Sequence, residues 1–190
     1  MTLHLAQDEA ADALLAADPL ALLIGMQLDQ QFPMERAFGS PYLLAQRLGV
    51  ERLDAAQLAD ADPDEMVRVF TGPPALHRYP GSMAGRVQAL ARVILAEFGG
   101  DAAAIWTGAS SGADLLARLR SLPGFGDQKS RIFVALLGKQ FGVRPDGWRE
   151  AAGSYGDDGT HRSVADVTGP DSLAAVRGFK RAAKQAAKGT

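Results

Sequence analysis

The sequence predicts an all-α protein, and two observations carry this prediction. Apolar residues recur at helical spacing over most of the chain, and no segment alternates convincingly at the period of a β-strand. Proline follows a small acidic residue at Asp18-Pro19 and again at Asp62-Pro63, an arrangement typical of helix starts. We therefore expect a single helical domain over residues 1–190, in one or two lobes, with the N- and C-terminal helices packing together.

Capping residues and prolines mark where the individual helices begin. Pro33 and Pro41 are expected to open two short helices, of which the second ends at Gly49, and Gly99 ends a longer amphipathic one. That longer helix carries Val87, Leu90 and Ile94 on one face. The helix starts expected from the sequence are Asp18-Pro19, Pro33, Ser40-Pro41, Asp54, Asp62-Pro63, Ser82, Ser111, Asp127 and Asp171.

Composition excludes several classes of protein. The chain has 190 residues, of which 47% are hydrophobic, so it is long enough to bury a core. It contains no cysteine, which excludes disulfides, zinc–thiolate sites and iron–sulfur clusters. No apolar run approaches the ~20 residues of a membrane span, and the acidic start does not resemble a signal peptide. We expect a cytoplasmic protein with no membrane partner and no metal site.

Charge is divided unevenly along the chain. The formal net charge is −2, but residues 1–65 hold 3 basic and 12 acidic side chains, whereas residues 66–190 hold 17 basic and 10 acidic ones. A chain divided in this way can present one basic face to a polyanion. The same division also fits a protein with an acidic start and no polyanionic partner.

The most informative segment is Leu-Pro-Gly-Phe-Gly at residues 122–126. Pro123 cannot readily continue the preceding helix, while Gly124 and Gly126 allow a tight turn with no side chain over it. The turn leads directly into a helix N-terminus, where backbone amides and the helix dipole favour an anion such as phosphate. The alternative is a plain turn between two helices.

Residues 122–148 resemble the signature of the helix-hairpin-helix DNA glycosylase superfamily, the group that contains endonuclease III and adenine glycosylase. Members have a Leu-Pro-Gly-(apolar)-Gly hairpin, a helix, a loop with Gly and Pro, and then an essential aspartate. Asp146 lies twenty residues after Gly126, which is the family position, and the resemblance extends from Ala21 to Gly147. It implies the all-α helix-hairpin-helix glycosylase fold. It further implies base excision repair by a monomer that acts on double-stranded DNA with a damaged or mismatched base, at the nucleoid of a bacterium.

Two departures from the family pattern refine this expectation. Bifunctional members carry a lysine two residues after the last hairpin glycine, where this chain has Gln128. An amide cannot form a Schiff base, and Lys129 is one helical step of about 100° away, so it should point elsewhere. The resemblance thus implies a monofunctional glycosylase without lyase activity at abasic sites. The family's iron–sulfur cysteines are absent, so no cofactor is expected beyond a monovalent cation at the hairpin.

Asp146 is the expected catalytic residue. Breaking the bond between base and sugar builds positive charge on the deoxyribose, and a nearby carboxylate stabilises that charge and directs the attacking water. The alternative is that Asp146 caps the helix that begins GWREAAG.

The resemblance also implies the residues that contact DNA. Gln27 and Tyr79 occupy the positions of side chains that fill the gap left by a flipped base. Gln27 could instead form a hydrogen bond at the end of its helix, and Tyr79 could pack on its loop. Beyond the hairpin we expect phosphate contacts from basic residues near it. His77 and Arg78, beside Tyr79, could also meet phosphates, although exposed residues of these types are common. The expected DNA-binding residues are Leu122, Pro123, Gly124, Phe125, Gly126, Lys129, Gln27 and Tyr79, supported by Arg131, Lys139 and the basic C-terminal helix.

Two further functions remain open from the residues alone. The protein could be a non-catalytic helix-hairpin-helix module that uses its hairpin only to bind phosphate, in which case it would tolerate loss of Asp146. It could also be a helical interaction protein with no salt-dependent affinity for DNA.

Overall fold

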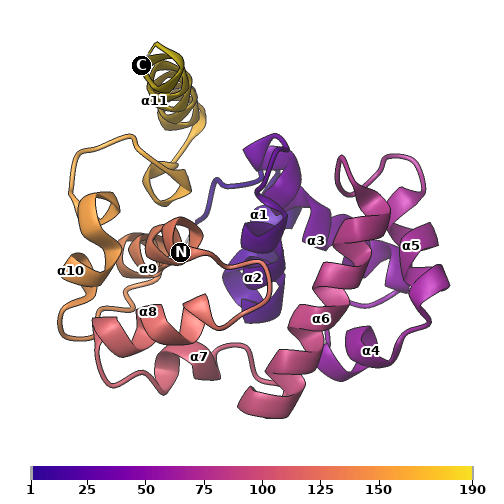
Figure 1. Cartoon of the computed structure of the whole chain (residues 1–190). Coiled ribbons are helices and arrows are strands. Elements are labelled where there is room, and N and C mark those ends of the chain that lie inside the picture. Colours follow the sequence, from indigo (N-terminus) through magenta and orange to yellow (C-terminus); the bar gives the residue numbers. More distant parts are fainter. Residues whose placement is uncertain (1, 190) are drawn as a thin grey trace.

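The computed structural model describes residues 2–189 and is all-helical over them, as the sequence predicts, with no strand (Figure 1). Its α-helices and two 3₁₀ helices, in chain order, are α1 (Glu9–Ala17), α2 (Pro19–Leu28), α3 (Met34–Leu48), α4 (Ala55–Asp60), α5 (Pro63–Thr71), α6 (Pro80–Phe98), α7 (Ala104–Thr107), α8 (Gly112–Arg120), α9 (Asp127–Gln140), α10 (Trp148–Ala152), η1 (Gly153–Gly156), η2 (Val164–Asp166) and α11 (Pro170–Lys188).

A buried carboxylate fixes the start of α2. Asp18 is 3% exposed and caps α2, because its Oδ1 accepts from the amides of Leu20 and Ala21. Its Oδ2 accepts from the amide of Leu53 at 2.8 Å, which ties the start of α2 to the loop before α4. The Asp18 side chain therefore caps its own helix and also bonds to a residue distant in sequence. Because both of its oxygens have hydrogen-bond donors, the charged side chain is tolerated in the interior.

Two expected helix starts are wrong. Pro41 does not open a new helix, since α3 runs from Met34 to Leu48 with this proline inside it. Apolar residues of α3 are buried on both sides of Pro41, and α3 packs against α2, α1 and α5, so tertiary packing outweighs the missing amide. The long amphipathic helix begins at Pro80, two residues before the expected cap Ser82, with Tyr79 at the N-cap position.

The helices form two groups with α2 between them (Figure 1). In one group α4 and α5 pack on α6, and α3 packs on α2 and α5. In the other, α8, α9 and α10 pack on one another. Helix α2 is buried over nearly its whole length, which matches its composition of almost only apolar residues. Side chains at the end of α2 consequently reach both groups.

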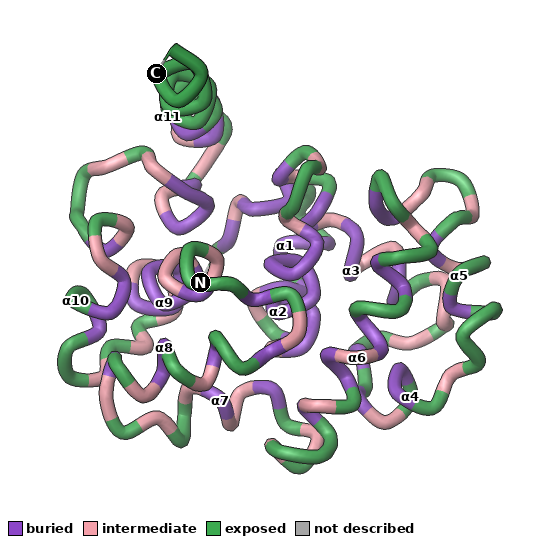
Figure 2. Tube along the Cα trace, viewed as in Figure 1, coloured by how far each residue is buried: buried purple, intermediate pink, exposed green. Residues whose placement is uncertain are grey.

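Helix α11 projects from the rest of the molecule and is mostly exposed (Figure 2). Leu173 and Val176 anchor its first half next to η2, whereas Phe179 remains 45% exposed. Beyond the anchor, Arg177 forms an ion pair with Glu35 of α3. The side chains that follow include Lys180, Arg181, Lys184 and Lys188.

No single helix in residues 2–189 is long and apolar enough to cross a membrane. Helices α1 and α2 reach that length and composition only as a pair, and they meet at a bend of 116°.

Candidate functional site

The segment 121–126 forms a tight hairpin between α8 and α9. Leu122 and Phe125 are buried and anchor it, and the amide of Phe125 donates to the carbonyl of Leu122 at 3.1 Å. Gly126 is the N-cap of α9 and is exposed, with open space where a side chain would begin. Because glycine has no side chain to accept from the first amides of α9, these amides are open to an outside acceptor.

Gln27 holds the hairpin against the rest of the molecule. Its Nε2 donates to the carbonyl of Pro123 at 2.9 Å and to the carbonyl of Arg86 at 3.1 Å. Gly124 has φ +82°, and a Cβ there would lie 3.1 Å from Cγ of Gln27, so both the conformation and the close approach favour glycine. Gln27 is only 1% exposed, which favours a supporting role over insertion into DNA.

Lys129 points inward from the first turn of α9. Its Nζ donates to the backbone carbonyl of Gln27 at 2.9 Å. Burial, opposed by the charge of Asp29 and aided by that of Arg86, lowers the pKa of Lys129 to about 8. Gln128 is exposed and donates to the hydroxyl of Tyr155, so the two neighbours face different ways.

Asp29 follows directly after α2 and faces Lys129. Burial raises the pKa of the Asp29 carboxyl above its ordinary value, against the opposing charges of Lys180 and Lys129, while the charge of Glu35 raises it further. These four side chains, Asp29, Glu35, Lys129 and Lys180, are called the charged cluster below. Among residues 2–189 no ion pair within 4 Å joins Asp29 to Lys129. The amine and the carboxyl therefore influence each other's pKa without forming a close ion pair.

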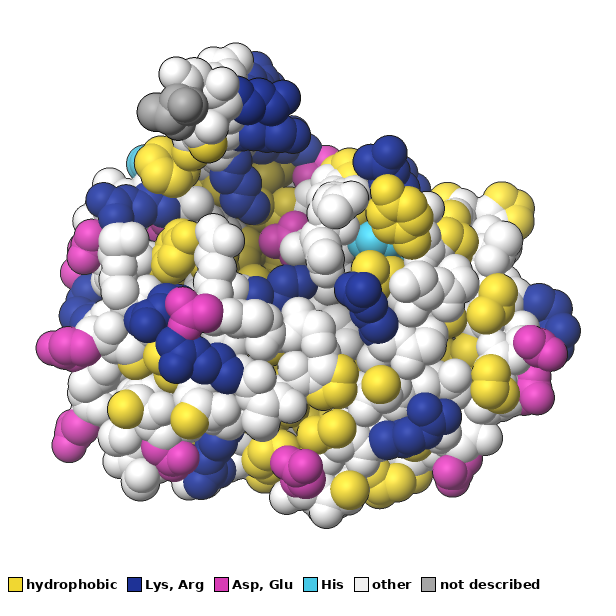
Figure 3. All heavy atoms as spheres, in the orientation of Figure 1, with side chains coloured by type: hydrophobic (Ala, Val, Ile, Leu, Met, Phe, Trp, Pro, Cys, Tyr) yellow, Lys and Arg dark blue, Asp and Glu magenta, His cyan; other side chains and the backbone are white. Residues whose placement is uncertain are grey.

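The charged cluster draws its members from the end of α2 and from α3, α9 and α11. Where α11 faces the body of the molecule, Figure 3 shows the surface hollowed, with Lys and Arg side chains along the inner side of α11 and apolar and acidic groups within the hollow. A hollow with basic side chains at its rim suits an anionic ligand.

Tyr79 lies on the same face as the hairpin and is 45% exposed. It shares one pocket with Gln30 and Arg86, and these two residues share a second pocket with the hairpin. Arg86 donates to the side-chain carbonyl of Gln30 at 3.3 Å. Tyr79, Gln30 and the hairpin thus form one continuous surface.

His77 does not meet phosphates, contrary to the sequence expectation. It is 1% exposed, its Nε2 donates to the carbonyl of Gln30 at 2.9 Å, and its Nδ1 accepts from the amide of Tyr79 at 3.0 Å. Burial lowers the pKa of the imidazole, so the neutral form is favoured. His77 acts as a brace that positions the loops carrying Gln30 and Tyr79.

Asp146 is exposed and lies apart from the charged cluster. Its backbone carbonyl accepts from the amide of Gly112 at 2.7 Å, at the first residue of α8. The hairpin begins at the opposite, C-terminal end of α8. This nine-residue helix is about 13 Å long at ~1.5 Å per residue. Asp146 does not cap α10, whose N-cap is Gly147 without a side-chain bond. The structure therefore brings Gln27 and Lys129 to the hairpin but leaves Asp146 elsewhere.

Two other expected DNA contacts are occupied by internal partners. Lys139 pairs with Asp166 at 2.6 Å, and Arg131 pairs with Asp127 at 2.9 Å. Basic side chains available to a ligand are found instead on α11 and at Arg86.

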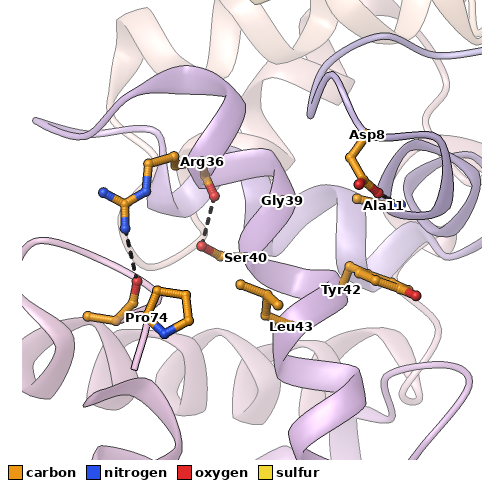
Figure 4. Close-up of a pocket in the computed structure, with 9 residues that line it drawn as sticks. Asp8, Ala11, Arg36, Gly39, Ser40, Tyr42, Leu43 and Pro74 are labelled. Carbon is orange, nitrogen blue, oxygen red and sulfur yellow. Dashed lines mark hydrogen bonds between the residues drawn. The ribbon is translucent and has the colours of Figure 1, made fainter. Parts of the chain in front are cut away.

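A separate pocket between α1 and α3 is lined mainly by apolar groups (Figure 4). Two of its polar side chains have internal partners: the Ser40 hydroxyl lies within hydrogen-bond distance of the carbonyls of Arg36 and Leu76, and Arg36 donates to the carbonyl of Ala75.

Asp29 is the residue that sequence reasoning missed. It directly follows the segment LALLIGMQL, which is apolar except for Gln27, and an acidic residue at the end of a buried helix is a usable signal. In residues 2–189 no group of three or more His, Cys, Asp or Glu side chains is placed to hold a metal ion.

No known family model, curated protein or solved structure matches the chain.

Proposed function

We propose that the protein is a DNA glycosylase with a helix-hairpin-helix fold, which binds duplex DNA and releases a damaged or mismatched base. The observation that carries the proposal is the position of the hairpin, whose open amides lie on the same face as Tyr79 and Arg86. The hairpin is also joined through Gln27 to the charged cluster. A phosphate-binding turn beside a hollow with an amine and a carboxyl is the arrangement that a base-excising enzyme needs.

Binding is assigned to three elements. The first amides of α9 donate hydrogen bonds to a DNA phosphate, and Arg86 supplies a positive charge beside them. The lysines and arginines of α11 contact the DNA backbone further along. Tyr79 offers an exposed ring for the gap or for an unstacked base. No sequence-specific reading is needed, because these contacts are all to backbone or to a ring face.

The chemistry is assigned to the charged cluster. Asp29 is the carboxyl of the cluster, and the charges of Lys180 and Lys129 oppose the effect of its burial by favouring the ionised form, which would stabilise a developing sugar cation. Asp146 remains the candidate from family position, and its distance from the hairpin argues for testing both carboxylates.

The test is incubation of the protein with a panel of duplexes that each carry one lesion or mismatch, followed by alkali to reveal abasic sites. We expect strand breaks after alkali for one class of lesion, and a DNA affinity that falls with salt at a log–log slope of about −0.9 per neutralised phosphate. A flat salt response would contradict DNA binding altogether.

A non-catalytic DNA-binding module is the second candidate, favoured by the position of Asp146 away from the hairpin. It predicts the same salt-dependent affinity with no base released from any duplex of the panel. The two measurements together therefore separate the proposals.

A further inference from the structure

The ion pair between Arg177 and Glu35 joins the two groups of helices. Glu35 lies in the first turn of α3, in the group that contains α5, whereas α11 packs on η2 next to α9. The guanidinium of Arg177 donates to Oε1 of Glu35, and the two residues are 142 positions apart in the chain. Lys180, three residues further along α11, acts on the neighbouring Asp29 through its charge. The ion pair therefore links α11 to the body of the molecule beside the hollow in Figure 3.

Arg177 is also the point at which α11 leaves its anchor. Leu173 and Val176 are the buried residues of this helix, and every residue from 177 to 188 is exposed. Among residues 2–189 no second ion pair within 4 Å ties α11 to the body. Since an exposed helix gains little from packing, the position of this part of α11 against α3 depends on the pair with Glu35.

The ion pair is built so that a stronger acceptor can replace Glu35. The Arg177 side chain is 49% exposed and that of Glu35 is 26% exposed, and pairs with this exposure contribute little to stability and weaken with salt. Oε2 of Glu35 is buried and has no hydrogen-bond partner, although an arginine can bond to both oxygens of a carboxylate. A phosphate offers the guanidinium a fuller set of acceptors than this half-used carboxylate does.

We propose that Arg177 closes the hollow in the free protein by pairing with Glu35, and that it exchanges this carboxylate for a DNA phosphate when a displaced nucleotide enters. The inference rests on the proposed function for the binding of duplex DNA, and it concerns the regulation of the same site. A DNA phosphate is the acceptor because Arg177 begins a row of basic side chains, continued by Lys180, Arg181 and Lys184, that no single small anion would occupy.

Nucleotide entry and loss of the ion pair are consequently coupled. Intact duplex that binds at the hairpin meets a closed hollow, and a nucleotide that leaves the stack has to compete with Glu35 for Arg177. Coupling of this kind is reciprocal, so removal of Glu35 eases entry by the same factor by which entry weakens the pair.

The first test locks the pair in the full chain. The chain contains no cysteine, so Arg177→Cys and Glu35→Cys place the only two thiols at the ends of the pair. A bis-maleimide with a disulfide in its spacer joins them, and half of the sample is then reduced to cut the spacer. The joined and cut forms have the same sequence and charge and carry the same added groups, so they differ in whether the hollow is held closed.

The measured quantity is the affinity for a duplex with one tetrahydrofuran abasic analogue divided by the affinity for the intact duplex. The analogue leaves the stack at little cost and requires no base release. We expect this ratio to be about tenfold or more lower in the joined form than in the cut form. Equal ratios in the two forms, or a ratio of one in the parent, would overturn the inference.

The second test measures the exchange itself with Glu35→Gln, Arg177→Gln and the double variant on the analogue duplex. Glu35→Gln removes the competing carboxylate, so we expect an affinity about three- to tenfold higher than that of the parent. In the Arg177→Gln background the same change should stay within about twofold, because no guanidinium is left to release. A gain of equal size in both backgrounds would show that Glu35 acts through its negative charge alone.

The two tests separate this inference from the proposed function. Release of a base from a lesion without any coupling between the two residues contradicts the exchange at Arg177 alone. Coupling without release of any base contradicts the glycosylase alone, and a flat salt response of the parent contradicts both.

Discussion

Two lysines on the same helix, Lys129 and Lys139, show how differently a partly buried amine can be used. Lys139 at the end of α9 is paired with Asp166 at 2.6 Å and also donates to the carbonyl of Asp157. Lys129 at the start of α9 has a backbone carbonyl as its hydrogen-bond acceptor and forms no ion pair within 4 Å among residues 2–189. A complete carboxylate partner makes the first lysine structural, whereas the second is buried without one and has a lowered pKa.

The carboxylate of Asp166 reinforces this difference. It also accepts from the amides of Arg162 and Ser163, and it completes the capping box of η2. Lys139 and Asp166 therefore belong to a saturated network that fastens η2 to α9. Asp29 has no comparable set of amide donors, so its charge depends on the members of the charged cluster.

The largest expected effect is on stability. Lys139→Met leaves the buried Asp166 without its cation, so we expect a loss of about 3–5 kcal/mol in the free energy of unfolding. Lys129→Met removes an amine that is costly to bury, and we expect unchanged or increased stability. Urea denaturation of both variants measures the contrast. Equal losses would show that the two lysines have the same role.

The pH dependence of stability sharpens the same contrast. The folded protein holds the Lys129 pKa at about 8 against 10.5 when unfolded, so between these values the unfolded state binds more protons. The free energy of unfolding should therefore rise by about 1–3 kcal/mol from pH 8 to pH 10.5, relative to Lys129→Met. When the free energy of unfolding of the variant is subtracted from that of the parent at each pH, the contributions of the other titrating groups cancel. Parallel curves would contradict the shifted pKa.

A smaller effect is expected at the hairpin. Gly126→Asp places a carboxylate where a phosphate would sit, so DNA affinity should fall about 10- to 100-fold on all sequences alike. Aspartate is also a good N-cap, and Gly126 has an ordinary φ of −75°, so the melting temperature should hold or rise. The control is Gly39→Asp, the same charge change on α3 with open space around it. Equal losses of affinity in both variants would point to charge alone.

Much of the fold was predictable because helix starts are local. Asp18, Asp54 and Asp62 cap the helices expected of them, since each side chain needs only the amides two or three residues later. Pro41 shows the limit of this reasoning. Packing of α3 on α2 keeps the segment around Pro41 helical. The residue pattern within that segment carries no information about this packing.

The site was predictable only in part, for the same reason. The hairpin is contiguous in sequence and could be recognised at residues 122–126. Whether Asp29 or Asp146 lies near Lys129 depends on how α2 and α8 are placed, and spacing along the chain does not record this. The burial of His77 and Gln27 likewise follows from contacts with the distant residues Gln30 and Pro123.

The measurement that tests the central claim most directly is single-turnover base release by Asp29→Asn and Asp146→Asn on one duplex that the parent cleaves well. Both changes keep side-chain size and remove one negative charge. If the chemistry takes place at the charged cluster, Asp29→Asn should lose about 10²–10⁴ in rate while DNA affinity is kept, and Asp146→Asn should stay within about twofold of the parent. The opposite pattern, with Asp146→Asn inactive and Asp29→Asn unimpaired, would contradict the claim and place the catalytic carboxylate at the position that the family resemblance implies.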